Sequence, residues 1–209
     1  MLTGAGKTFT WDSQNRMAIV NTPGIGTSTY FYDYTNIRVR KDTPTGITIF
    51  PFAGYEKDPN GVITKHIRIG QEIFAAKKGT NKLFYHNDHL GGVNVITNAS
   101  GLLAQLIEYD PWGKVSRSEG SGDSLRRFTG QILDPESGLY YYGGRYYDQE
   151  ITRFISPDPF VQDPDDPQNL NRYSYARNNP LKYTDPTGYG WFKKLGKALL
   201  AAVLAVVTI

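Results

Sequence analysis

The sequence predicts a mainly β fold in which successive strands form a meander. Tyrosine and glycine are abundant, at 15 and 22 of 209 residues, and this profile favours strands and turns over helices. Aromatic residues precede acidic ones at a recurring interval, because Asp12 and Asp33 lie 21 positions apart and Asp88 and Asp110 lie 22 apart. A single unit of this length cannot bury both of its faces, so neighbouring units must stack. We therefore expect β-meander layers of a shell-type sheet.

Residues 1–114 are the first predicted region, a YD-repeat-like β region. Stretches such as FTWDSQNRM and YFYDYTNIRVRK alternate aromatic and polar residues, as strands with one buried face do. Glycine, proline, asparagine and aspartate favour breaks between strands. Turns are accordingly expected at KDPNG (57–61), NASG (98–101) and DPWG (110–113).

Residues 115–123, VSRSEGSGD, are polar and glycine-rich, which predicts a linker. The boundary placed here separates the first region from a second one at 124–189. In the second region GLYYYGGRYY (138–147) predicts one strand, which DQEIT turns back into RFIS. A two-residue hairpin turn at Gly143-Gly144 is the alternative register.

Two further elements are predicted near the C-terminus. Residues 169–178, NLNRYSYARN, follow a proline-rich and acidic surface loop and form the predicted short helix, which Pro180 ends. Residues 190–209 place three lysines before twelve mostly apolar residues, and an apolar helix is expected there. Twelve helical residues span about 18 Å, less than the ~30 Å hydrocarbon core of a bilayer. The segment is expected to be either the truncated start of a membrane-contacting stretch or a terminal core helix.

Charge and cysteine content exclude several classes of function. The formal net charge of +3 equals the contribution of Lys193, Lys194 and Lys197, so the rest of the chain is balanced at 20 basic and 20 acidic residues. No nucleic-acid partner is expected for such a neutral body. The chain has no cysteine, which rules out disulfides and thiolate metal sites. The first residues, MLTGAGKTFTWD, lack the features of a secretory signal.

Three segments occur in an order that resembles the RHS repeat-associated core of the RHS/YD-repeat family. They are YHNDHLGGVNVITNASGLLAQLIEYDPWG (85–113), TGQILDPESGLYYYGGRYYDQEITRFISPDP (129–159) and NLNRYSYARNNPLKYTDPTG (169–188). The family is found in bacterial polymorphic toxins and insecticidal toxin complexes. The resemblance implies a secreted or cell-surface shell of YD repeats, whose core closes one end around a variable C-terminal polypeptide, often a toxin. It implies as partners the chain's own upstream shell repeats and that C-terminal segment, which would begin at residue 190.

The resemblance also implies a self-cleaving site. Its core arginine falls on Arg145 of GRYY, and its two aspartates fall on Asp158 of SPDP and Asp185 of DPTG. The family cleaves its chain after a leucine that follows the DPxG motif. Tyr189 stands in that place here, which makes Tyr189 and Gly190 the expected cleavage site.

Aspartic-type hydrolysis needs two carboxylates close together, because one accepts a proton from water while the other donates one. Asp158 and Asp185 are the expected pair, and Asp148 is a reserve candidate. Arg145 is expected either to keep one carboxylate ionised or to stabilise the oxyanion. On the alternative interpretation, the Asp-Pro pairs only cap turns and Arg145 forms a structural ion pair.

Other candidate sites are weaker. GAGKT at 4–8 is similar to the end of a phosphate-binding loop, but the first glycine of that motif would fall on Met1. His86, Asp88 and His89 have too few partners for a metal site, and a turn explains them better. No cofactor or metal is expected. The tyrosines suit a carbohydrate-binding or adhesion module, which is the alternative function, although packing on the half-buried inner face of a sheet explains them better.

Overall fold

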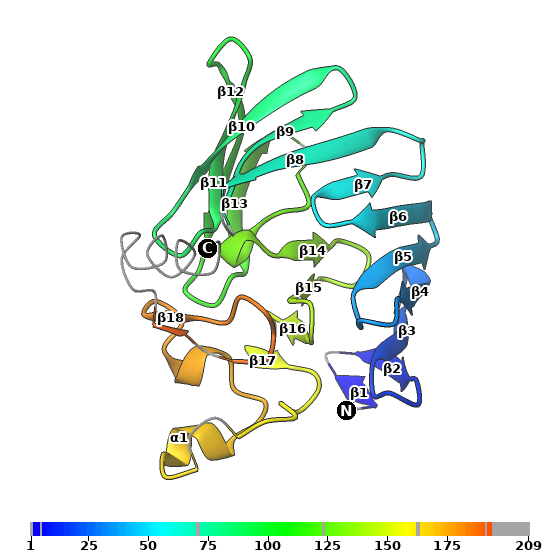
Figure 1. Cartoon of the computed structure of the whole chain (residues 1–209), viewed down its shortest axis with the longest axis vertical. Helices are drawn as coiled ribbons and strands as arrows, with labels where there is room; N and C mark the ends of the chain where they lie inside the picture. The colour runs from blue at the N-terminus through cyan, green and yellow to red at the C-terminus, as the bar shows by residue number, and fades with distance from the viewer. Residues whose placement is uncertain are drawn as a thin grey trace, which may run out of the picture.

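The computed structural model describes residues 2–4, 6–69, 72–122, 124–161, 164–190 and 192–193. Over these residues the predicted mainly β fold class is confirmed. Thirteen strands form one antiparallel sheet in which each strand pairs with the next along the chain, so the predicted meander is present. Figure 1 shows this sheet arching from the blue N-terminal strands to the green ones, with a smaller sheet inside the arch.

The strands of the large sheet are short and follow one another closely. They are β1 (Thr3–Gly4), β2 (Lys7–Trp11), β3 (Met17–Thr22), β4 (Gly26–Tyr32), β5 (Arg38–Thr43), β6 (Gly46–Phe52), β7 (Tyr55–Lys57), β8 (Ile63–Ile69), β9 (Glu72–Lys78), β10 (Asn81–Asn87), β11 (Val93–Asn98), β12 (Leu103–Tyr109) and β13 (Val115–Gly120). In strands such as β2 the side chains alternate between a buried face and an exposed face.

One turn recurs between these strands and explains why aspartate ends each repeat. The side chain Oδ1 accepts hydrogen bonds from the backbone N–H groups two and four positions later, and the residue's own N–H donates to the carbonyl four positions later. The six turns that share this pattern begin at Asp12, Asp33, Asp58, Asp88, Asn98 and Asp110. Three positions after each lies an asparagine or glycine with positive φ, such as Asn15 at 60° and Gly113 at 89°. Those residue types adopt the left-handed region most readily.

The predicted linker at 115–123 is wrong for most of its length. Residues Val115–Gly120 form β13, which pairs with β12 from Gln105↔Gly120 to Tyr109↔Val115. β13 is the last strand of the large sheet, so its outer edge has no neighbouring strand among the described residues. Polar and charged side chains are typical of such an edge strand, and they account for a composition that is also typical of a linker. The division into regions at 1–114, 124–189 and 190–209 stays a prediction.

The smaller sheet contains the tyrosine-rich stretch. Its strands, in order, are β14 (Ile132–Asp134), β15 (Leu139–Tyr141), β16 (Tyr146–Asp148) and β17 (Arg153–Phe154). The single strand predicted at 138–147 is wrong and the alternative hairpin at Gly143-Gly144 is correct, because β15 and β16 pair across that turn. The Tyr142 N–H closes the turn on the Arg145 carbonyl at 3.0 Å. DQEIT does turn the chain back into β17, as expected.

The short helix predicted at 169–178 is present only at its two ends. α1 (Pro167–Leu170) begins after Asp166, whose side chain accepts from the Gln168 N–H, and a 3-10 turn covers Ala176–Asn178. The turn's three residues all have positive φ, which a continuing α-helix cannot contain. Another 3-10 turn lies at Phe128–Gly130, and β18 (Tyr183–Thr184) pairs with β19 (Phe192–Lys193).

The apolar C-terminal helix expected within 190–209 falls almost wholly outside the described residues. Among the helices that the structure does describe, none is long and apolar enough to cross a membrane.

Both faces of the small sheet are buried. Tyr141 and Tyr146 pack with residues of the large sheet such as Phe9 and Tyr30. Tyr140, Tyr142 and Tyr147 pack on the other side with Phe128, Phe154 and Tyr175. These five tyrosines of the GLYYYGGRYY stretch are between 0% and 8% exposed. They form the core that joins the two sheets and present almost no surface to a ligand.

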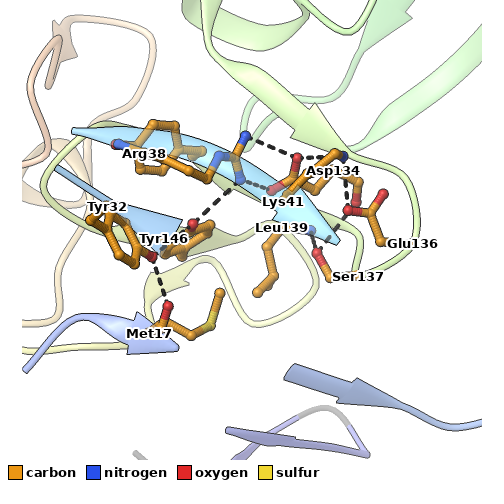
Figure 2. Close-up of polar contacts among 10 residues, drawn as sticks. Met17, Tyr32, Arg38, Lys41, Asp134, Glu136, Ser137, Leu139 and Tyr146 are labelled. Atoms are coloured by element: carbon orange, nitrogen blue, oxygen red, sulfur yellow. Dashed lines mark hydrogen bonds and ion pairs between the residues drawn. The ribbon is translucent and has the colours of Figure 1, made fainter. Parts of the chain in front are cut away.

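A buried ionic cluster also joins the two sheets (Figure 2). Arg38 of β5 donates to both carboxylate oxygens of Asp134 at the end of β14, and to the Tyr146 hydroxyl at 3.3 Å. Lys41, also on β5, binds Asp134 at 2.9 Å and Glu136 at 2.8 Å. Burial opposes ionisation of Asp134, but Arg38 and Lys41 more than offset it and lower the pKa of that carboxyl.

Candidate functional site

The structure brings Arg145, Asp158 and Asp185 together in one buried cluster. Arg145 ends the hairpin turn before β16, Asp158 lies in the loop after β17, and Asp185 follows β18. The same Arg145 nitrogen, Nη2, lies 2.9 Å from Oδ2 of Asp158 and 3.1 Å from Oδ2 of Asp185. All three residues are buried, at 4%, 6% and 2% exposure. Their catalytic roles stay predictions.

Every nitrogen of the Arg145 guanidinium has a partner. Nε donates to the Gly188 carbonyl, and Nη1 donates to the Arg172 carbonyl at 3.1 Å. The guanidinium carbon lies 3.7 Å from the centre of the Phe154 ring, a stacking contact. Burial lowers the pKa of Arg145 and the two carboxylates oppose that effect, yet an arginine remains charged in such a site. Arg145 therefore acts as a fixed cation between the two aspartates and the chain at Gly188.

Asp185 also begins a turn that its side chain closes, but it accepts from a different set of N–H groups than the aspartates of the repeats. Its Oδ1 accepts from the N–H groups of Thr187 at 3.3 Å, Gly188 at 2.8 Å and Gly190 at 3.1 Å. Gly188, three positions later, has a φ of +75°. Burial raises the pKa of Asp185, and Arg145 and the three backbone N–H groups oppose that rise without cancelling it. The carboxyl thus holds a proton to higher pH than an exposed aspartate does.

Asp158 is held by backbone contacts with Arg172. Its N–H donates to the Arg172 carbonyl at 2.8 Å, and its own carbonyl accepts from Arg172 Nε at 2.6 Å. Its Oδ1 accepts from the Phe160 N–H at 2.9 Å. The Arg172 carbonyl also accepts from Arg145 Nη1, so Arg172 contacts both Asp158 and Arg145. Sequence reasoning missed this residue, since it lay inside the predicted helix at 169–178 and carried no motif of its own.

The expected cleavage site lies directly against the cluster. The nitrogen of the Tyr189–Gly190 peptide bond donates to Asp185, and the preceding carbonyl, that of Gly188, accepts from Arg145. The Tyr189 side chain packs on Gly144 and meets the Phe160 ring edge-on, with 6.4 Å between ring centres.

Two pockets share Arg145 as part of their walls. One, of about 370 Å³ and partly open to solvent, is lined by polar residues together with Arg145, Asp158 and Asp185. The other, of about 300 Å³, has Tyr189 in its wall. Both carboxylates thus line one pocket, and Tyr189 lines the other.

The remaining candidates have other roles. Asp148, the reserve candidate, is fully buried and binds Lys7 at 3.2 Å and the Glu150 N–H at 2.9 Å, so its contacts lie outside the cluster. Asp88 closes one of the recurring turns. His86 contacts the Thr97 hydroxyl at 3.1 Å, as expected for turn and strand residues.

Comparison with known proteins identifies relatives of great length. The chain is 32% identical over 195 residues to the tRNA3(Ser)-specific nuclease WapA of Bacillus spizizenii, covering 87% of this chain and 8% of the relative. It is 32% identical over 135 residues to the double-stranded DNA deaminase toxin A of Burkholderia cenocepacia, covering 62% of this chain and 9% of the relative. The chain thus spans less than a tenth of the length of either curated relative.

The fold matches a solved structure as well. The crystal structure of TcdB2-TccC3 superposes with a TM-score of 0.74 at 19% identity, over 88% of this chain and 10% of that one. A family model described as Teneurin YD-shell matches residues 69–181, more than half of the chain and a range that includes Arg145 and Asp158. The strand meander with its recurring aspartate and asparagine turns, the residues matched by the family model and the shared fold all indicate the same family. The chain belongs to the YD-shell family.

Proposed function

We propose that this chain is the C-terminal part of a YD shell that encloses a C-terminal cargo polypeptide, and that the protein cuts its own backbone after Tyr189. The two relatives support the shell role, because one is named a tRNA nuclease and the other a DNA deaminase toxin. Chains with such different named activities both contain a segment similar to this one, so that segment would serve a purpose common to them. Secretion or display at a cell surface follows from the same proposal.

One contact carries the proposal of self-cleavage. The Gly190 N–H, which belongs to the bond to be cut, donates to Asp185 Oδ1 at 3.1 Å. The same carboxyl has a raised pKa and shares Arg145 Nη2 with Asp158. A carboxyl whose pKa is raised beside a leaving nitrogen suits the role of general acid when it is protonated, and its neighbour suits the role of base.

The proposed reaction uses one water molecule. Asp158 takes one proton from the water, and the water oxygen bonds to the Tyr189 carbonyl carbon. The bond from that carbon to the Gly190 nitrogen then breaks, and the nitrogen takes the proton of Asp185. The products are a carboxylic acid at Tyr189 and an amine at Gly190, and a proton passes from Asp158 to Asp185 to restore the pair.

Arg145 would act mainly by position. Its guanidinium contacts the two carboxylates, the Arg172 carbonyl and the Gly188 carbonyl, which lies one residue before the carbonyl that is attacked. We therefore assign it the alignment of the 188–190 backbone and the ionisation of Asp158, the first of the two roles expected from the sequence. Preorganised alignment of this kind supplies much of the rate in intramolecular reactions.

Intact-mass measurement on the purified 209-residue chain tests the proposal. The wild type should yield two products, residues 1–189 and 190–209, while Asp158→Asn and Asp185→Asn should stay whole. Asp58→Asn is the matched control, because Asp58 begins an Asp-Pro-x-Gly turn outside the buried cluster. A wild type that is folded by circular dichroism and stays uncut would contradict the proposal, as would an Asp185→Asn chain that is cut at the wild-type rate.

The carbohydrate-binding alternative is not favoured. It needs tyrosine rings on the surface, and the rings of the GLYYYGGRYY stretch are buried in the two cores. Membrane contact through residues 190–209 remains a separate proposal, and it predicts liposome binding that is lost when those residues are deleted.

A further inference from the structure

Gly144 lies where a side chain would collide with Tyr189. A Cβ atom built on Gly144 would be 2.4 Å from Cε2 and Cζ of the Tyr189 ring and 2.7 Å from Cε1. Contacts under 3.0 Å do not occur for real Cβ atoms, so the ring would have to move. The aromatic ring thus occupies the volume that any other residue at position 144 would fill.

The backbone at position 144 does not itself require glycine. The preceding residue, Gly143, has a φ of +87°, which the hairpin turn needs and which favours glycine. Gly144 has no such positive φ. Its N–H donates to the Thr187 carbonyl at 2.9 Å, a bond that any residue except proline can make. What requires a glycine at position 144 is therefore the ring of Tyr189.

Other aromatic residues also lie near the Tyr189 ring. Phe160, two residues after Asp158, meets Tyr189 edge-on at 72° between ring planes, although Tyr189 is still 39% exposed. Tyr189 and Gly144 line the pocket of about 300 Å³, together with Trp11, Tyr32 and Tyr146. Because Trp11 and Tyr32 end β2 and β4 and Tyr146 begins β16, residues of both sheets surround this pocket.

The position of the ring fixes the position of the bond to be cut. Tyr189 is the residue between Gly188, held by Arg145, and Gly190, held by Asp185. We expect a ring that is displaced from Gly144 to shift the Tyr189 backbone as well, and with it the carbonyl carbon relative to the carboxylates. Displacements of about 1 Å in such sites cost up to roughly a hundredfold in rate.

We propose that Gly144 determines specificity at the cleavage site, by leaving open the space that seats a flat aromatic side chain at position 189. This inference rests on the proposed self-cleavage. A β-branched or γ-branched side chain at 189 is not flat and does not fill the slot, whereas a ring does. Gly144 and residue 189 thus form a matched pair in which a larger residue at one position demands a smaller one at the other.

Cleavage rates of four chains test the pair, namely wild type, Gly144→Ala, Tyr189→Leu and the double variant. Gly144→Ala should cut at least about tenfold more slowly than the wild type, because the displaced ring misaligns the bond. The double variant should cut faster than Gly144→Ala, since leucine vacates the space that the new methyl group takes. Tyr189→Phe keeps the ring and should be cut faster than Tyr189→Leu.

Two readouts separate this inference from the proposed function. If the wild type is cut and Gly144→Ala is cut equally fast, the inference is wrong and self-cleavage stands. If the wild type is not cut, self-cleavage fails, but the packing of the Tyr189 ring on Gly144 can still be measured by NMR. It should appear as an upfield ring-current shift of the Gly144 α-protons that disappears in Tyr189→Leu. Absence of that shift in the wild type would overturn the proposed packing itself. Thermal melting of Gly144→Ala, expected near the wild-type temperature, controls for folding.

Discussion

Replacement of Arg38 by methionine should lower the free energy of unfolding more than a substitution on the surface does, because Arg38 joins the two sheets. Arg38 is 2% exposed, binds Asp134 through two nitrogens and stacks on Tyr141 with its guanidinium carbon 4.3 Å from the ring centre. Removing one partner of a buried ion pair typically costs about 3–5 kcal/mol. Lys41 still binds Asp134 at 2.9 Å, so we expect a loss near the lower limit, about 3 kcal/mol.

Urea denaturation followed by tryptophan fluorescence measures this loss, because Trp11 packs against the core that contains Tyr141 and Tyr146. Urea is uncharged and leaves ion pairs unscreened, and the shift in midpoint at constant slope gives the change in free energy of unfolding. The double variant Arg38→Met/Asp134→Leu removes both charges and should recover at least half of the loss. A single variant that loses less than about 1 kcal/mol, or a double variant no more stable than the single, would refute the reasoning.

The same pair gives a pH dependence of known sign. The folded pKa of Asp134 is lowered, so its contribution is fully present above the unfolded pKa, near 3.9, and is lost as pH falls through the folded pKa. The gap in stability between wild type and Arg38→Met should therefore be constant near neutral pH and shrink in acid below about pH 4. A gap that widens on acidification would mean that the carboxylate is not what Arg38 stabilises.

Three further predictions concern the turns, the exposed face and the cleavage site. Asp110→Ala removes the acceptor for two backbone N–H groups, and should lower the free energy of unfolding by about 1–2 kcal/mol in the same urea assay. Lys77 lies directly across from Lys65 and from Lys82, so Lys77→Glu should raise stability by a few tenths of a kcal/mol at low salt, and the gain should vanish in concentrated salt. Cleavage needs the protonated form of Asp185, whose pKa burial raises, so the rate from timed intact-mass samples should fall as pH rises through that pKa, and a rate that climbs steadily to alkaline pH would exclude it as the acid.

The meander could be predicted because its signal is local. Each turn needs only an aspartate or asparagine, a left-handed residue three positions later, and hydrogen bonds within five residues, as at Asp12 and Asp110. β13 could not be recognised by the same signal. Its polar side chains follow from its place at the edge of the sheet, and composition alone does not distinguish an edge strand from a linker.

The predicted helix failed for a different reason. Residues 169–178 contain no proline or glycine, so nothing local excluded a helix. The helix instead ends at Leu170, and a turn at Arg172 follows in which the Arg172 carbonyl binds Arg145 and its side chain binds the Asp158 carbonyl. Those partners lie 27 and 14 positions away, and long-range contacts of this kind override local helix propensity.

The candidate site shows how far local sequence reasoning extends, because Asp185 and Asp110 have nearly the same local motif. Both begin an Asp-Pro-x-Gly sequence, and both accept backbone N–H groups on Oδ1. The resemblance placed Asp185 in a reaction site, but its residues alone were equally consistent with a turn. What differs is tertiary: Asp185 is 2% exposed and shares an arginine nitrogen with Asp158, whereas Asp110 is partly exposed and closes a hairpin. An aspartate that begins an Asp-Pro-x-Gly turn thus becomes a candidate proton donor when it is buried beside a second carboxylate. Its carboxyl oxygen also accepts from the Gly190 N–H, whose nitrogen belongs to the bond to be cut.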